Sequence, residues 1–161
     1  MIRVLFVCTG NICRSPTAEG VFRHMVVAEG FGEVIVAESA GTHGYHVGEP
    51  PDPRTVAAAA ARGVDLRALR ARRVARDDFH SFDLILAMDR GHLEHLRAIQ
   101  PEGARAELKL FLDFHPIDRE SAAPKDVPDP YYGGPEGFEA VLDLVEITSR
   151  ALLTIINTRY R

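Results

Sequence analysis

The chain has 161 residues, 46% of them hydrophobic and 26% charged, with a formal net charge of −4. This length and composition predict one globular domain over residues 1–161, and the slightly acidic charge argues against nucleic acid as a partner. No apolar run approaches the roughly 20 residues of a membrane span, and no signal-peptide cleavage region follows the N-terminus, so we expect a cytoplasmic protein without a membrane partner.

The first part of the chain alternates strand and helix patterns. Residues 2–7 are, apart from Arg3, a short continuous apolar run, which is typical of a strand buried on both faces. Ser15 followed by Pro16 predicts a helix start, with the serine hydroxyl as cap and the proline in the first turn. Helical spacing of apolar residues continues to Gly30. Residues 34–37 are the second predicted strand.

The middle of the chain repeats this alternation. Residues 41–53 are rich in glycine, proline and histidine, which predicts a long surface loop. An alanine-rich helix is expected over residues 53–62, followed by a charged segment, 67–78, that is irregular or a short helix. Residues 84–88 read as a third buried strand, and 90–99 as a helix.

The last third completes the predicted sheet. A fourth strand is expected at residues 108–112, and residues 113–134 carry four prolines without periodicity, which predicts a loop. Residues 135–160 have the apolar spacing of a long amphipathic helix. Strands that alternate with helices favour right-handed crossovers. We therefore predict an α/β fold with a four-stranded parallel sheet flanked by helices on both faces, a Rossmann-like three-layer arrangement.

The sharpest chemical signal is a cysteine at the end of the first strand. Cys8 ends the apolar run, and Arg14 follows six residues later at the start of a helix. In parallel sheets ligands bind beyond the carboxyl ends of the strands. Backbone N–H groups and a helix N-terminus can hold an anion there, and an arginine fork binds two phosphate oxygens. A thiol in such a field ionises readily and attacks phosphorus, which predicts a cysteinyl-phosphate intermediate.

The loop between these two residues is the predicted phosphate site. Asparagine tolerates a left-handed backbone, as a tight anion-binding loop requires, and Asn11 has the position for it. Ser15 can cap the helix and can also donate a hydrogen bond to the sulfur of Cys8. The residues expected to bind phosphate or another oxyanion are Thr9, Gly10, Asn11, Ile12, Cys13 and Arg14.

Asp129 is the candidate acid. Cleavage of an aryl phosphate leaves a phenolate, which a positioned carboxylic acid can protonate before it activates the attacking water. Prolines on both sides of Asp129 restrict the backbone. Tyr131 and Tyr132 follow directly and could flank a flat aromatic substrate. Taken alone, an aspartate in a proline-rich loop is more often a turn residue, so this alternative stays open.

Four segments of the chain resemble the low-molecular-weight protein-tyrosine phosphatase family. They are VLFVCTGNICRSPTAE (4–19), AESAGTHGYHVGEPPDPR (37–54), DLILAMDR (83–90) and VPDPYYGG (127–134). The resemblance covers the whole chain. It implies a phosphotyrosine protein phosphatase I-like fold and hydrolysis of phosphotyrosine in proteins, without a metal or other cofactor. By position it makes Cys8 the nucleophile, Arg14 the phosphate clamp, Asp129 the general acid and Ser15 a donor to the thiolate.

The same resemblance suggests supporting residues and shows two departures. Asp89 would order the site, with helix capping as the alternative, and Ser39 would support the loop. Tyr45 stands where many relatives carry tryptophan, which suggests a smaller pocket wall. Many eukaryotic relatives have a histidine that orders the loop asparagine, but residues 66–73 contain none, so Asn11 must be supported otherwise. The predicted substrate pocket consists of Ile12, Tyr45, Tyr131 and Tyr132.

Other functions share residues with this pattern. Arsenate reductases on this scaffold pass a disulfide through later cysteines, but no cysteine follows Cys13. Phosphoarginine phosphatases of this type carry threonine where Ile12 stands. A non-enzymatic binding module would be expected to lack Cys8, Arg14 or Asp129. The seven histidines suggest metal, but zinc usually needs three or four converging ligands at characteristic spacing, so we expect none.

Cys13 has a possible second role. It is the one other cysteine in the chain and lies in the same loop as Cys8. An accessible thiolate oxidised by peroxide forms a sulfenic acid, which a nearby thiol can convert to a disulfide. Cys13 is therefore the predicted redox partner of Cys8, with simple packing against the first helix as the alternative.

Overall fold

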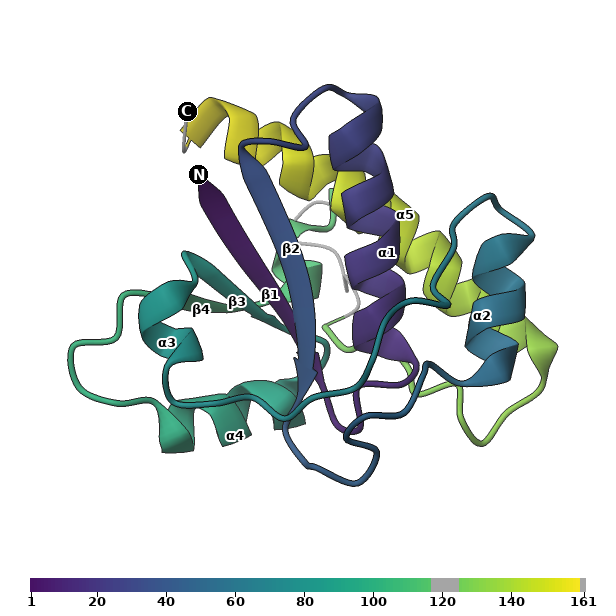
Figure 1. Ribbon diagram of the computed structural model, residues 1–161, viewed down its shortest axis with the longest axis horizontal. Helices are drawn as coiled ribbons and strands as arrows, with labels where there is room; N and C mark the ends of the chain where they lie inside the picture. The colour runs from purple at the N-terminus through teal and green to yellow at the C-terminus, as the bar shows by residue number, and fades with distance from the viewer. Residues whose placement is uncertain (117–124, 160–161) are drawn as a thin grey trace.

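The computed structural model describes residues 1–116 and 125–159 (Figure 1). At its centre is a four-stranded parallel sheet with the strand order β2-β1-β3-β4. The strands are β1 Ile2–Cys8, β2 Ile35–Gly41, β3 Leu84–Ala87 and β4 Glu107–Leu110. This arrangement confirms the predicted fold class.

Helices cover both faces of the sheet. The helices are α1 Arg14–Ala28, α2 Pro53–Ala60, α3 Asp78–Ser81, α4 Arg90–Ile99 and α5 Pro135–Arg159. Figure 1 shows α1, α2 and α5 on one side and α3 and α4 on the other. Because successive strand side chains point to opposite faces, Val4 and Phe6 join the cluster under α1 and α5, while Leu5 and Val7 join the cluster under α4. None of the described helices is long and apolar enough to cross a membrane.

The order of the strands brings the loop that follows β1 close to the loop that follows β3. β1 pairs with β2 on one side and with β3 on the other, so the chain reverses its direction of winding beside β1. Val7 lies opposite Ala87 in this register, and the loops that follow β1 and β3 therefore begin side by side. Open parallel sheets bind ligands at such a switch point.

Several predicted boundaries were wrong. β2 extends to Gly41, beyond the predicted end at residue 37, because its pairing with β1 continues to the Cys8–Gly41 register. β4 ends at Leu110, and the predicted end of that strand forms instead a 3-10 turn, Phe111–Phe114. A short apolar run is compatible with either structure, and burial of three side chains of this turn explains the pattern. Most of the predicted loop 113–134 is irregular as expected, but residues 117–124 and Tyr160 lie outside the described residues.

Candidate active site

The loop that links β1 to α1 is fastened to the end of β2. The backbone N–H of Thr42 donates to the carbonyl of Cys8 at 2.8 Å, and that of His43 donates to the carbonyl of Thr9 at 3.1 Å. A side chain at Gly41 would place its Cβ 2.7 Å from the Thr9 carbonyl oxygen. Glycine at this position therefore permits the close approach of the two backbones.

Asn11 shapes the middle of this loop. Its φ is 59°, the left-handed backbone that the sequence predicted, and its side chain is buried. Its amide nitrogen donates to Ser15 Oγ at 2.8 Å and to Ser39 Oγ at 2.9 Å, and its amide oxygen accepts from the backbone N–H of Arg72 at 3.0 Å. A backbone N–H and two serines thus support Asn11 in this chain, which lacks the histidine of many relatives.

The support extends to a buried glutamate that sequence reasoning missed. Ser39 donates to Glu19 Oε1 at 2.6 Å, and Glu19 also pairs with Arg23. Burial raises the pKa of the Glu19 carboxyl above its ordinary value, partly opposed by the bond from Ser39. Glu19 lies three residues before Phe22 and seven before Val26, on the buried face of α1, so its helical spacing was the signal that could have placed it inward.

Ser15 contacts the nucleophile candidate and does not cap the helix. α1 begins at Arg14 with Cys13 at its N-cap and without a side-chain capping bond, so the predicted cap at Ser15 was wrong. Ser15 Oγ lies 2.9 Å from the sulfur of Cys8 and accepts from Asn11, while its other acceptor, the Ala40 carbonyl, is 3.5 Å away. The serine proton can therefore point at the sulfur, as a stabilised thiolate requires.

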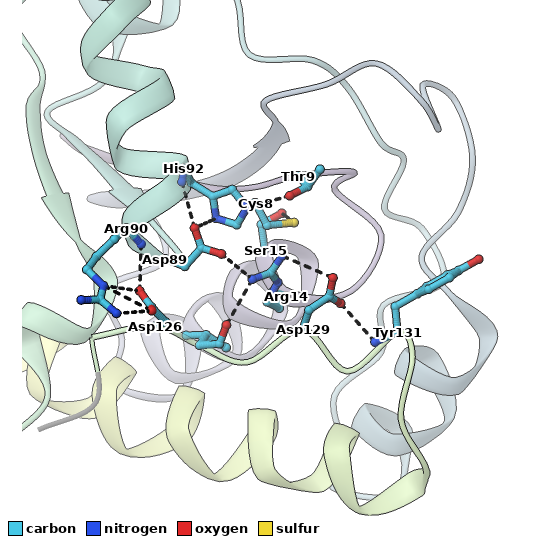
Figure 2. Close-up of polar contacts among 11 residues, drawn as sticks. Cys8, Thr9, Arg14, Ser15, Asp89, Arg90, His92, Asp126, Asp129 and Tyr131 are labelled. Atoms are coloured by element: carbon cyan, nitrogen blue, oxygen red, sulfur yellow. Dashed lines mark hydrogen bonds and ion pairs between the residues drawn. The ribbon is translucent and has the colours of Figure 1, made fainter.

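The Arg14 guanidinium is buried and held from two other loops (Figure 2). Nη1 donates to Asp89 Oδ2 at 2.9 Å and to the carbonyl of Val127 at 3.1 Å, and Nη2 lies 3.7 Å from Asp129 Oδ2. Asp89 also accepts from the backbone N–H of His92 and caps α4. Asp89 therefore caps α4 and also contacts Arg14, while its role in ordering the site stays a prediction.

The segment that carries Asp129 is attached to the sheet on the same side. The backbone N–H of Val127 donates to the carbonyl of Met88 at 2.8 Å, and this bond joins the segment to the residue that follows β3. Asp126 accepts from the backbone N–H of Arg90 at 2.9 Å and pairs with its guanidinium, which lowers the pKa of the Asp126 carboxyl. These contacts were not foreseen, since they join positions 36 and 39 residues apart.

Asp129 itself remains accessible. Its side chain is 43% exposed, and its Oδ1 accepts from the backbone N–H of Tyr131 at 3.1 Å. This local bond is the turn geometry expected for an aspartate in such a loop. Its other oxygen faces Arg14, so the turn directs the carboxyl toward the phosphate loop (Figure 2).

These groups surround one cleft of about 240 Å³. It is lined by Cys8, Thr9, Gly10, Ile12, Cys13, Arg14, Tyr45, His46, Asp129, Tyr131 and Tyr132. The supporting residues Asn11, Ser15, Ser39 and Asp89 are absent from this lining and act from behind it. A larger groove of about 660 Å³ lies between α1 and α5, but neither cysteine lines it. The smaller cleft is the candidate active site because it contains Cys8, Arg14 and Asp129, although the other groove is larger.

Aromatic side chains form the rim of the cleft. Tyr131 and Tyr132 meet edge to face at 5.0 Å between ring centroids, and Tyr132 is 88% exposed. On the opposite loop Tyr45 stacks on His43, also at 5.0 Å. His46 lines the cleft too and was not foreseen; its Nδ1 lies 2.7 Å from Glu49. The rim therefore presents ring faces and edges to a substrate.

Cys13 differs sharply from an activated cysteine. It is buried, and burial raises the pKa of its thiol to about 12, opposed in part by the nearby hydroxyl of Thr55. Cys13 is thus a neutral thiol near pH 7. No cluster of three or more histidine, cysteine or acidic side chains within residues 1–116 and 125–159 is arranged to hold a metal ion.

A thiol and an arginine that share one loop after the first strand of a parallel sheet are groups suited to nucleophilic attack on a bound phosphoryl group, the chemistry of a phosphatase. The family model described as low molecular weight phosphotyrosine protein phosphatase matches residues 3–161. A low molecular weight protein-tyrosine-phosphatase of Streptomyces coelicolor is 47% identical over 155 residues, covering 96% of this chain and 93% of that one. The chain belongs to this family, and it is a hydrolase.

Solved structures agree with the family assignment. A protein tyrosine phosphatase of Entamoeba histolytica, with Hepes in its active site, matches with a TM-score of 0.92 and 34% identity over the whole of both chains. A Drosophila arginine phosphatase matches with a TM-score of 0.85 and 29% identity, covering 95% of this chain and 96% of that one. The fold alone therefore does not separate phosphotyrosine from phosphoarginine as a substrate.

Proposed function

We propose that this enzyme hydrolyses phosphotyrosine in proteins through a cysteinyl phosphate on Cys8, without a metal. One observation carries the proposal: Cys8 and Arg14, from the loop between β1 and α1, and Asp129, from a distant segment, line the same cleft of about 240 Å³. The 3.7 Å contact between Arg14 and Asp129 places the proposed acid beside the proposed phosphate ligand. The predicted single domain and cytoplasmic location remain part of this proposal.

In the first step the thiolate of Cys8 attacks phosphorus. An S–P bond forms and the bond between phosphorus and the tyrosine oxygen breaks, while Arg14 and the loop N–H groups bind the phosphoryl oxygens. Asp129 gives its proton to the departing phenolate. Ser15, 2.9 Å from the sulfur, holds the thiolate in place before the attack.

In the second step water releases the phosphate. Asp129, now a carboxylate, takes a proton from water, whose oxygen attacks phosphorus as the S–P bond breaks. The electron pair returns to Cys8, and the hydrogen bond from Ser15 stabilises the leaving thiolate. Phosphate then leaves and Asp129 is protonated again.

The rim of the cleft supports an aromatic substrate. Tyr131, Tyr132 and Tyr45 can flank a phenyl ring above the phosphate loop, and the apolar side chain of Ile12 lines the same cleft. The proposed partner is therefore a tyrosine-phosphorylated protein. Phosphoarginine is the second candidate, favoured by the likeness to the arginine phosphatase.

Replacing Cys8 with serine tests the covalent mechanism. Turnover of a phosphotyrosine peptide should fall by several orders of magnitude, because the serine hydroxyl is not ionised at neutral pH. Vanadate should still bind, since Arg14 and the loop N–H groups remain, and this binding also reports correct folding. EDTA should leave wild-type turnover unchanged. Turnover of Cys8→Ser within tenfold of wild type would exclude a cysteinyl phosphate. Rates on phosphotyrosine, phosphoserine and phosphoarginine peptides decide the substrate class.

A further inference from the structure

His92 is a buried imidazole that touches two parts of the site. It lies in the first turn of α4 and is 5% exposed. Its Nε2 is 2.8 Å from the hydroxyl of Thr9, the residue after the nucleophile, and its Nδ1 is 3.1 Å from Asp89 Oδ1 (Figure 2). The other oxygen of Asp89 accepts from Arg14 at 2.9 Å. One ring thus bridges the phosphate loop and the carboxylate that holds the arginine.

The charges around the ring decide where its proton lies. Burial, followed by the positive charge of Arg14, lowers the pKa of His92 to about 4, against the opposing effect of Asp89, Asp129 and Asp126. The ring is therefore neutral near pH 7 and carries one N–H. The carboxylate beside Nδ1 favours the proton on that atom, which leaves Nε2 as an acceptor for the Thr9 hydroxyl.

The contact with Asp89 is close but is not a directed hydrogen bond. Within the described part of the chain no well-aligned hydrogen bond reaches Nδ1, although Asp89 Oδ1 lies 3.1 Å from it. The attraction between the ring N–H and the carboxylate is therefore electrostatic. It still limits the positions that Asp89 can take, and Asp89 in turn limits those of Arg14.

We propose that His92 is a positioning residue for phosphate binding, which fixes the Thr9 end of the loop and the Asp89–Arg14 pair in one relative arrangement. The inference rests on the proposed role of Arg14 as the phosphate ligand. His92 does not line the cleft and touches no reacting atom, so it acts only through Thr9 and Asp89. A ring that merely filled the core would need neither hydrogen-bonding nitrogen.

Phosphate affinity separates positioning from packing. We would measure the Kd of inorganic phosphate by calorimetry, with melting temperatures, for wild type, His92→Phe, Thr9→Val and Thr9→Ser. His92→Phe keeps the volume of the ring, and Thr9→Val keeps the shape of the side chain, but each removes the polar contact between His92 and Thr9. Thr9→Ser keeps the hydroxyl that makes this contact. His92→Phe and Thr9→Val should each weaken phosphate about tenfold, the effect of one lost hydrogen bond. The variant that combines His92→Phe with Thr9→Val should bind phosphate only slightly more weakly than either single variant.

Controls make the outcomes distinct. Thr9→Ser, which keeps the hydroxyl, should lose less phosphate affinity than Thr9→Val. His80→Phe, at an exposed histidine on α3, should leave the phosphate Kd unchanged. Lower melting temperatures with an unchanged phosphate Kd in His92→Phe and Thr9→Val would overturn the inference and leave the proposed function standing. A wild type that binds no phosphate and has no phosphatase activity would overturn both. Nitrogen-15 NMR of the ring should show the proton on Nδ1, and a proton on Nε2 would contradict the arrangement.

Discussion

Acidification should destabilise this protein through His92, and His92→Phe should remove that part of the pH dependence. The folded protein keeps the buried ring neutral, with its pKa lowered to about 4, whereas the ring in the unfolded chain has the ordinary value of 6.5. Between these two values the unfolded chain binds a proton that the folded protein does not. The free energy of unfolding therefore falls as the pH drops from 6.5 to 4. Below pH 4 the ring is protonated in both states, so His92 lowers the free energy of unfolding no further.

The size of the effect follows from the two pKa values. Each unit between the ordinary 6.5 and about 4 corresponds to 1.36 kcal/mol, so the linkage of His92 amounts to about 3 kcal/mol. This is a large fraction of the 5–15 kcal/mol that stabilise a typical domain. Asp52 and Asp126 have pKa values lowered mainly by hydrogen bonds from Arg54 and Arg90, so they add to acid destabilisation in wild type and variant alike.

Urea unfolding at pH 7, 6, 5 and 4 measures the linkage directly. Between pH 7 and pH 4 the free energy of unfolding should fall by about 3 kcal/mol more in wild type than in His92→Phe. This holds whatever the difference in that free energy at pH 7. His80→Phe, which removes an exposed histidine, should follow the wild-type curve. A constant difference between wild type and His92→Phe at all four pH values would refute the assignment of a neutral buried ring.

Three further predictions concern the chemistry of the cleft. Asp129→Asn should slow hydrolysis of phosphotyrosine by about 10² to 10⁴ but slow that of a nitrophenyl phosphate much less, since only the poor leaving group needs the proton; equal losses in the phosphorylation step would remove Asp129 from the acid role. Ile12→Thr should shift the ratio of phosphotyrosine to phosphoarginine rates about ten- to a hundredfold toward phosphoarginine, and an unchanged ratio would assign specificity to the rim tyrosines. After peroxide treatment, reductant should restore the activity of wild type but not that of Cys13→Ser. Before reduction, mass spectrometry of wild type should show an internal disulfide, which forms as the Cys8 sulfenic acid condenses with the Cys13 thiol and releases water. Because the pKa of Cys13 is raised to about 12 by burial, this disulfide should form faster at alkaline pH, and equal recovery of both proteins would leave Cys13 as a packing residue.

The sequence determined the features that depend on neighbouring residues. The apolar run at residues 4–7 of β1 indicated a strand buried on both faces, and the alternation of strand and helix patterns along the chain predicted a parallel sheet. The distance of six residues from Cys8 to Arg14 leaves one short loop between a strand and a helix, which predicted an oxyanion site. Asparagine in the middle of that loop predicted the left-handed backbone that the structure shows.

The tertiary structure decided which distant groups complete the site. Arg72 supports Asn11 across 61 positions, Asp89 holds Arg14 across 75, and His92 reaches Thr9 across 83. Local pattern cannot foresee such contacts, because they arise from the order in which strands pair. Even the start of α1 was decided in this way: Ser15 is a good cap by type, but its hydroxyl instead contacts Cys8 and Asn11. A side chain with one hydroxyl serves the partners that the fold brings closest, and only the assembled sheet determines which those are.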